Sequence, residues 1–426
     1  MGMPSTVSPA QASAQWQALG AFAPHTKAVF EHALAASADA ILGDIPACLD
    51  LPEPDPVDAA WDAALALPTT EDGSVTVREL YLRYVLTRAI VDQGSDIQGV
   101  EMWHSQVIER CYGASPPIAF LHSPSSFVER YPDVLAIAAE AARDVTAARA
   151  KDWADAAPGR TAGAYTPFNV NGMRGGKQAH WFTSARLFPA VLLSHALSGG
   201  LTDVVFRAGP PAERPLGMAR RLRNDPVLGL GWCLGDKAAD LFTKWAVGSL
   251  RLTPSRPRDW APIDVAIPMD QRIGRLMMRT GLMDEFFGVP HLISDRVMFE
   301  NRAAVPIPAA PAIPDGVFCL TVMEFRRRGR VPHGSPAAAW LNGAWRLYRT
   351  GPQPNWAPQE VVAILCQAAS AALGRQLSPV HLDDLFMRVG GTWCIDPTPV
   401  CVGCVFERSC QANNDANRAP LKRYIT

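Results

Sequence analysis

The sequence predicts an all-α fold. Apolar residues recur with the spacing of amphipathic helices in stretches such as 77–90, 134–148 and 181–197. Proline-rich joints, such as the one at 51–56, separate such stretches. The alternation typical of a strand is scarce and is clearest at 317–322. We therefore expect a predominantly helical protein.

The chain has 426 residues, enough for two or three domains. Composition sets apart residues 1–150, and the family resemblance of the motifs described below implies three further segments. We expect an acidic helical domain of unknown role at 1–150, a core with the candidate reactive residues at 151–300, an inserted basic segment at 301–355, and a returning helix with a cysteine-rich loop at 356–426.

Composition also bears on where the protein works. The sequence has no run of 18 or more apolar residues, and its first thirty residues lack the pattern of a secretory signal. Its mean hydropathy is close to zero. We expect a cytoplasmic protein that does not insert into a membrane and is a monomer.

Charge is unevenly distributed along the chain. Residues 1–150 hold 8 Lys/Arg against 19 Asp/Glu, whereas the other 276 residues hold 32 against 22. The net charge of -1 therefore conceals an acidic part of -11 and a basic part of +10. A basic part of this size permits contact with nucleic acid, although two solvated surfaces of different composition would give the same balance.

Four of the nine cysteines lie within seventeen residues near the C-terminal end. They are Cys394, Cys401, Cys404 and Cys410, with the spacing C-x6-C-x2-C-x5-C. Clustered thiolates in a long chain without a signal peptide indicate a metal site in a reducing compartment. Four thiolates suit either tetrahedral zinc or a [4Fe–4S] cluster. Zinc sites usually pair two C-x2-C knuckles, and this loop has one.

Two upstream segments carry candidate reactive residues. Lys237 follows Gly235 in a glycine-rich turn, and Asp270 comes 33 residues later in the pattern D-x-x-I-x-R. Pro268 and Asp270 predict a helix start with Asp270 as its N-cap. From the residues alone, a lysine at a helix start is more often a solvated surface residue.

Together these segments resemble the helix-hairpin-helix DNA glycosylases. The cysteine spacing matches the cluster loop of the endonuclease III and MutY enzymes. The turn at 233–239 resembles their hairpin, except that Cys233 replaces the first glycine. Residues 263–282 and 379–387 resemble the archaeal 8-oxoguanine glycosylases (the AGOG family), which lack such a cluster loop.

The resemblance implies a role for each matching residue. Lys237 would be the nucleophile, Asp270 the catalytic carboxylate, and the four cysteines the ligands of a [4Fe–4S] cluster. The implied base pocket contains Asp383, Trp181 and Met387, the last at a position where the archaeal family has tryptophan. The implied contacts to the DNA backbone come from Gly235, Arg272 and Arg275.

The function implied is that of a DNA N-glycosylase in base excision repair. Such an enzyme binds double-stranded DNA, flips a damaged base into its pocket and removes it, with 8-oxoguanine as the first candidate. A lysine Schiff base would add AP-lyase activity. We expect a nucleoid-associated enzyme, to which the basic run 326–330 could add DNA contacts. Two alternatives stay open: a non-catalytic iron–sulfur nucleic-acid-binding protein, and an enzyme acting on another modified base or on RNA.

Overall fold

The computed structural model describes residues 7–36, 59–91, 121, 200–206, 213–224, 236–254, 260, 264–287, 329–349, 353–354, 356–375, 377–395 and 399–413. Helices dominate these residues, and their one β feature is an isolated antiparallel bridge between Pro68 and Thr76. The prediction of a predominantly helical protein is therefore confirmed for these residues. None of the helices in these ranges is long and apolar enough to cross a membrane.

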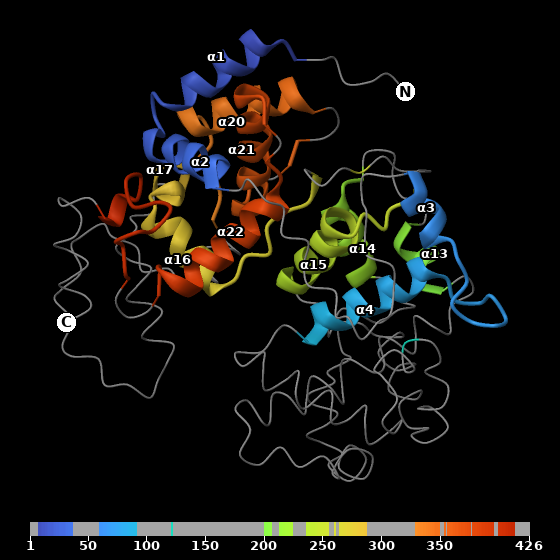
Figure 1. The fold of residues 1–426 in the computed structure, drawn as a ribbon. Coiled ribbons are helices and arrows are strands. Elements are labelled where there is room, and N and C mark those ends of the chain that lie inside the picture. Colours follow the sequence, from blue (N-terminus) through green and yellow to red (C-terminus); the bar gives the residue numbers. More distant parts are fainter. Residues whose placement is uncertain are drawn as a thin grey trace, which may run out of the picture. The chain divides into compact units, whose positions relative to one another are not determined.

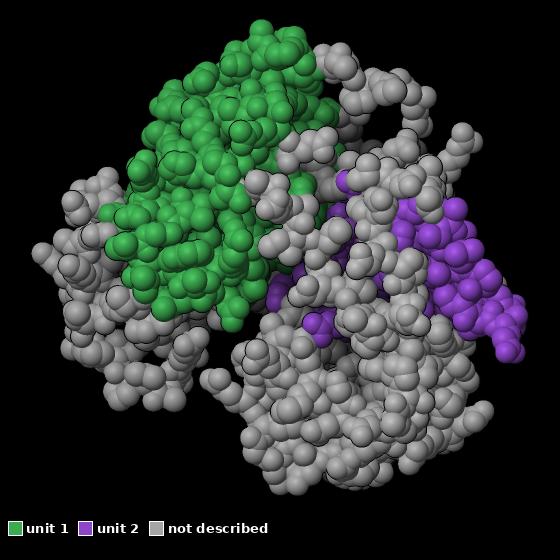
Figure 2. Space-filling model, in the orientation of Figure 1, with its two compact units in different colours: residues 1–41, 262–426 green, residues 42–261 purple. Residues whose placement is uncertain are grey.

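The chain forms two compact units (Figure 2). Unit 1 consists of residues 1–41 and 262–426, and unit 2 consists of residues 42–261. This division differs from the four consecutive segments expected from the sequence. The acidic segment 1–150 contributes to both units, and the core expected at 151–300 is divided between them.

Unit 1 is built from seven α-helices among its described residues, together with a short 3-10 turn (Figure 1). They are α1 (Pro9–Leu19), α2 (Pro24–Ala36), α16 (Gln271–Arg279), α17 (Leu282–Phe287), α20 (Pro336–Tyr348), α21 (Pro358–Leu373), α22 (Pro379–Thr392) and the turn η6 (Gln411–Asn413).

Three of these helices begin with the same local signal. Ser8, Ser335 and Ser378 are the N-caps of α1, α20 and α22, and each is followed by proline. The serine hydroxyl accepts a hydrogen bond from a backbone N–H of the first turn, and proline there needs no N–H partner. At the other end of a helix, Gly374 stops α21 in a left-handed conformation. Short side-chain signals thus set several helix ends.

Helix α1 completes the core that the C-terminal helices form. It packs against α20 and α21, which Figure 1 shows beside it. Trp16 is buried and makes an edge-to-face contact with Phe30, with ring centroids 6.4 Å apart. Gln15 Nε2 donates to the carbonyl of Trp340, whose indole N–H donates back to the carbonyl of Gln15 at 2.7 Å. Residues more than 320 positions apart therefore share one core.

Helix α2 is capped by a carboxylate from a distant helix. Glu285, in α17, accepts hydrogen bonds from the backbone N–H groups of His25 and Thr26 at 2.9 and 2.7 Å, and from the Thr26 hydroxyl. A carboxylate at this position satisfies N–H groups that have no partner within their helix and complements the positive end of the helix dipole. Glu285 therefore fixes α2 to α17.

Unit 2 contains five α-helices and a π-helical turn in its described part. They are α3 (Ala59–Leu65), α4 (Val77–Val91), α13 (Gly200–Phe206), α14 (Pro215–Asn224), α15 (Asp236–Thr243) and the turn η4 (Lys244–Ser249). Helix α15 packs against α14 and α4. Glu79 in α4 forms a buried ion pair with Arg83 at 2.8 Å and also accepts the backbone N–H of Leu201 at the start of α13. This buried carboxylate joins α4 to α13.

The contribution of α1 to unit 1 can be tested with one substitution. Trp16→Ala should lower the free energy of unfolding by about 3–5 kcal/mol, because it leaves a cavity between α1 and α2. Urea unfolding measures the change. Gln17→Ala, on the exposed side of the same helix, is the matched control and should change little. Equal stability of the two variants would contradict the packing of α1 into the core.

Candidate functional site

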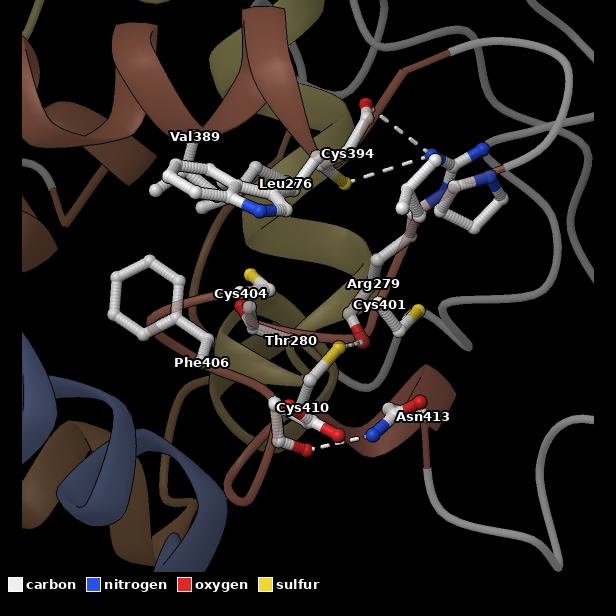
Figure 3. A pocket seen from close by; sticks show the side chains of 14 residues that line it. Leu276, Arg279, Thr280, Val389, Cys394, Cys401, Cys404, Phe406, Cys410 and Asn413 are labelled. Atoms are coloured by element: carbon white, nitrogen blue, oxygen red, sulfur yellow. Dashed lines mark hydrogen bonds between the residues drawn. The ribbon is translucent and has the colours of Figure 1, made fainter.

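The four clustered cysteines line a single cavity in unit 1 (Figure 3). It lies between the C-terminal ends of α16 and α22 and the loop 399–413, with an empty volume of about 380 Å³ that includes space open to solvent. The rest of its wall is mostly apolar and includes Leu276, Val389, Trp393, Pro399, Val400 and Phe406. The predicted ligands are therefore gathered around one space.

Backbone hydrogen bonds shape the loop that carries these cysteines. The N–H of Val400 donates to the carbonyl of Trp393 at 2.8 Å and closes the base of the loop. The N–H of Cys404 donates to the carbonyl of Cys401 at 3.1 Å, so these two cysteines lie on one tight turn. Gly403 stands between them with φ +79°, a conformation that glycine adopts without strain. The C-x2-C spacing thus folds as the turn that a metal knuckle needs.

The C-terminal end of α16 contacts the first and the last of the four cysteines. Arg279 Nη1 donates to the carbonyls of Cys394 and Ile395 at 3.3 and 3.1 Å, and lies 3.5 Å from the sulfur of Cys394. The thiol of Cys410 donates to the carbonyl of Arg279 at 3.4 Å. Arg279 itself is 1% exposed. The two ends of the cysteine loop are therefore attached to one residue of α16.

The cavity is a costly place for an unpaired thiolate. Burial raises the pKa of the Cys404 thiol, and the negative charges of Cys394 and Cys401 nearby raise it further. A bound metal displaces the thiol proton and neutralises part of this charge. The donor set therefore suits a cation held by several thiolates.

Zinc and a [4Fe–4S] cluster bind four thiolates with different geometries. In the part of the chain that the structure describes, no three thiol, imidazole or carboxylate groups are placed to hold a single metal ion. Tetrahedral zinc with Zn–S bonds of about 2.3 Å brings its sulfurs to within roughly 3.8 Å of one another. A [4Fe–4S] cluster binds its four thiolates at separate irons and spans a wider space. Four thiolates at one cavity therefore suit either group by their chemistry.

Asp270 begins the helix whose other end contacts the cysteine loop. It is the N-cap of α16, and its Oδ1 accepts the backbone N–H of Ile273 at 2.8 Å. The predicted helix start and cap are confirmed. The side chain is half-buried, and its catalytic role stays a prediction.

Lys237 lies in the first turn of α15 and is half-buried. It belongs to unit 2, whereas Asp270 and the four cysteines belong to unit 1. The hairpin expected before it, with Gly235 and Cys233, lies outside the described residues. The helices on either side of that segment, α14 and α15, pack against each other.

The residues predicted for the base pocket are only partly described. Asp383 is buried in α22 at 2% exposure. Met387 follows it by four positions and packs against the hydrophobic core of unit 1. Residues four apart lie on one face of a helix, so both could line the same space. Trp181 lies outside the described residues, and the pocket role of all three stays a prediction.

The two arginines of α16 that were predicted to contact the DNA backbone differ in their exposure to solvent. Arg272 is exposed, as a phosphate contact requires. Arg275 is 5% exposed and donates to the carbonyl of Gly390 at 3.4 Å, because this side of α16 packs against α22. Its predicted phosphate contact does not fit this burial. In the basic run, residues 326–328 lie outside the described residues, and Arg330 is exposed.

Sequence reasoning gave no role to Arg279. The available signal was the position of this arginine at the end of α16. From Ile273 onward, the side chains of this helix are apolar except for Arg275 and Arg279. A charge in such a helix is rarely buried without specific partners. The partners came from a loop more than 110 residues away.

Comparisons of the chain with protein-family models, with curated proteins and with solved structures give no match. The site is therefore interpreted from its own residues and contacts.

The junction between α16 and the loop depends on Gly281. This residue has φ +83°, and a Cβ on it would lie 2.4 Å from Oε1 of Gln411. Gln411 is the residue that follows Cys410 in the chain. Gly281→Ala should lower the free energy of unfolding by more than the ~1 kcal/mol that a left-handed alanine costs, because Gln411 must also move. Gly374→Ala is the matched control, since Gly374 has φ +62° and open space around it. Equal losses in urea unfolding would contradict the tight contact.

Proposed function

We propose that this protein is a DNA N-glycosylase with AP-lyase activity that carries a [4Fe–4S] cluster on its four clustered cysteines. The observation that carries this proposal is the position of α16. The helix begins at Asp270 and ends at Arg279 against the cysteine loop. Two motifs that the resemblance pairs in one enzyme family are thus joined by nine helical residues.

The cluster would act through structure. When bound, it would cross-link the four cysteines and hold the loop closed against α16. Arg408 is exposed on that loop, where it could contact a phosphate. The apolar cavity wall would cover part of the cluster.

A base must leave the duplex before its glycosidic bond can be reached, and enzymes of this kind hold the flipped base in a pocket. Helices α16 and α22 pack together and carry Asp270 and Asp383. A buried carboxylate such as Asp383 could bind the polar edge of a base. Its neighbour Met387 would give an apolar and adaptable surface.

The chemistry follows from a lysine and a carboxylate. Lys237, as a neutral amine, would attack C1′ of the sugar, and the base would leave with the electron pair of the glycosidic bond and gain a proton. The positive charge that develops on the sugar would be stabilised by Asp270. Ring opening would then give a Schiff base, from which β-elimination breaks the 3′ C–O bond.

DNA binding would rest mainly on phosphate contacts from the basic part of the chain. Residues 151–426 carry a net charge of +10, and Arg272 exposes its side chain beside Asp270. Binding of this kind weakens steeply with salt, because it releases counterions from the DNA.

One observation favours a second candidate, a non-catalytic iron–sulfur nucleic-acid-binding protein. Asp270 has a structural task as the cap of α16, which would explain its presence without catalysis. Loss of turnover would leave the cluster and DNA binding in place, so an activity assay distinguishes the two functions.

The metal content of the purified full chain gives the first test. We expect a brown protein with broad visible absorbance and about four irons per chain. Cys404→Ser should lose most of the iron, because one ligand of four is removed. Cys366→Ala removes a buried cysteine outside the loop and should keep the iron content of the native chain. One stoichiometric zinc without iron would refute the cluster.

The nucleophile is tested by borohydride reduction on duplexes with damaged bases, 8-oxoguanine first. If Lys237 forms the Schiff base, borohydride should trap a covalent protein–DNA adduct. Lys237→Gln should abolish trapping while DNA affinity changes little, because one cation among many contacts is lost. Asp270→Asn should lose most base removal yet keep the fold, since asparagine caps a helix as well as aspartate does.

The alternative outcomes are also distinct. If the adduct persists in Lys237→Gln but is lost in Lys244→Gln, the nucleophile is Lys244, which lies seven residues further along the chain. Absence of an adduct with any damaged base or abasic site, together with intact DNA binding, would support the non-catalytic candidate.

A further inference from the structure

The guanidinium of Arg279 is a permanent positive charge inside unit 1. The side chain is among the largest that are fully buried, and arginine stays protonated in proteins. Taking such a charge out of water costs several kcal/mol, which only well-placed partners offset. The groups that surround Arg279 are therefore informative about what the protein holds there.

The partners of Arg279 Nη1 belong to the loop that would bind the cluster. They are the carbonyls of Cys394 and Ile395 and the sulfur of Cys394. Arg279 also lines the cysteine cavity, and Figure 3 shows its side chain beside Cys394. Four thiolates around an iron–sulfur core would supply negative charge next to it.

We propose that Arg279 is a positioning residue of the metal centre, which orients the Cys394 thiolate and, by an N–H···S hydrogen bond, raises the reduction potential of the bound cluster. This inference rests on the proposed cluster. Hydrogen bonds to ligand sulfurs and nearby positive charge stabilise the reduced state, which is one electron more negative. The effect is strong here because the guanidinium is shielded from water.

The two carbonyl contacts add a second effect. By holding the backbone of Cys394 and Ile395, Arg279 sets the direction in which the chain leaves α22. Loss of such an outer contact typically weakens metal binding by about 10–100-fold. Arg279 should therefore control how fast the cluster is lost, as well as its potential.

The test compares two buried arginines of the same helix. Arg279→Lys keeps the positive charge, but the shorter side chain lacks the Nη1 that contacts two carbonyls and a sulfur. Arg275→Lys is the matched control, because Arg275 is also buried and donates to the Gly390 carbonyl of α22. Each full-length variant is examined for iron content, for release of iron to a chelator and for its one-electron midpoint potential at an electrode.

We expect Arg279→Lys to release iron at least tenfold faster than the native chain. Its midpoint potential should fall by an amount that changes the oxidised-to-reduced ratio about tenfold, which is about 59 mV for one electron. Arg275→Lys should match the native chain in both measurements. Equal potentials and release rates in all three proteins would overturn the role of Arg279.

A measurement on the native chain keeps the inference testable if Arg279→Lys does not fold. The Fe–S stretching bands in the resonance Raman spectrum should shift after long exchange into D₂O, because the hydrogen bond to sulfur then carries deuterium. Unchanged bands would refute the N–H···S bond. Native protein without iron would instead refute the proposed cluster, so the two failures are distinguishable.

Discussion

The buried guanidinium of Arg279 requires hydrogen-bond acceptors that stay in place, and the cysteine loop provides them. The carbonyls of Cys394 and Ile395 are directed to Arg279, so the chain must leave α22 along one path. The thiol of Cys410 returns to the carbonyl of the same residue. These contacts involve only protein atoms. The loop is therefore arranged around the end of α16 by contacts between protein atoms.

The N-terminal helices take part in the same arrangement. His32 in α2 is 2.8 Å from the hydroxyl of Ser409, a buried residue next to Cys410. Helix α2 is in turn fixed to α17 by the Glu285 cap. Segments from the two ends of the chain thus enclose the loop, and its stability depends on contacts of very long sequence separation. Closing so long an intervening chain costs conformational entropy, which these contacts must offset.

Local features of the structure were predictable from sequence because their causes are local. The helical class follows from apolar spacing, and Asp270 follows the pattern of an N-cap, which its hydrogen bond to Ile273 confirms. The spacing of the four cysteines predicted that they lie together, and they line one cavity. In each case the residues that make the feature lie within a few turns of one another.

The features that sequence did not predict depend on what a helix packs against. Arg272 and Arg275 look alike in sequence, yet one is exposed and the other donates to Gly390 in α22. Likewise, the apolar face of α1 gives no sign that α20 and α21 cover it, so residues 1–150 looked like a separate domain. Periodicity identifies the buried face of a helix but not its partner.

Helix α16 connects Asp270, the proposed catalytic carboxylate, to the cysteine loop. At about 1.5 Å per residue, its nine residues place the cap roughly 14 Å from the cysteine loop. The carboxylate is oriented by its hydrogen bond to Ile273, so its direction follows that of the helix. The other end of the helix is held by the cysteine loop through Arg279 and by the fit of Gly281 to Gln411. Under the proposed function, Asp270 must be placed to within a fraction of an ångström, and a short helix fixed at its C-terminal end would favour this placement without the proposed cluster approaching the substrate.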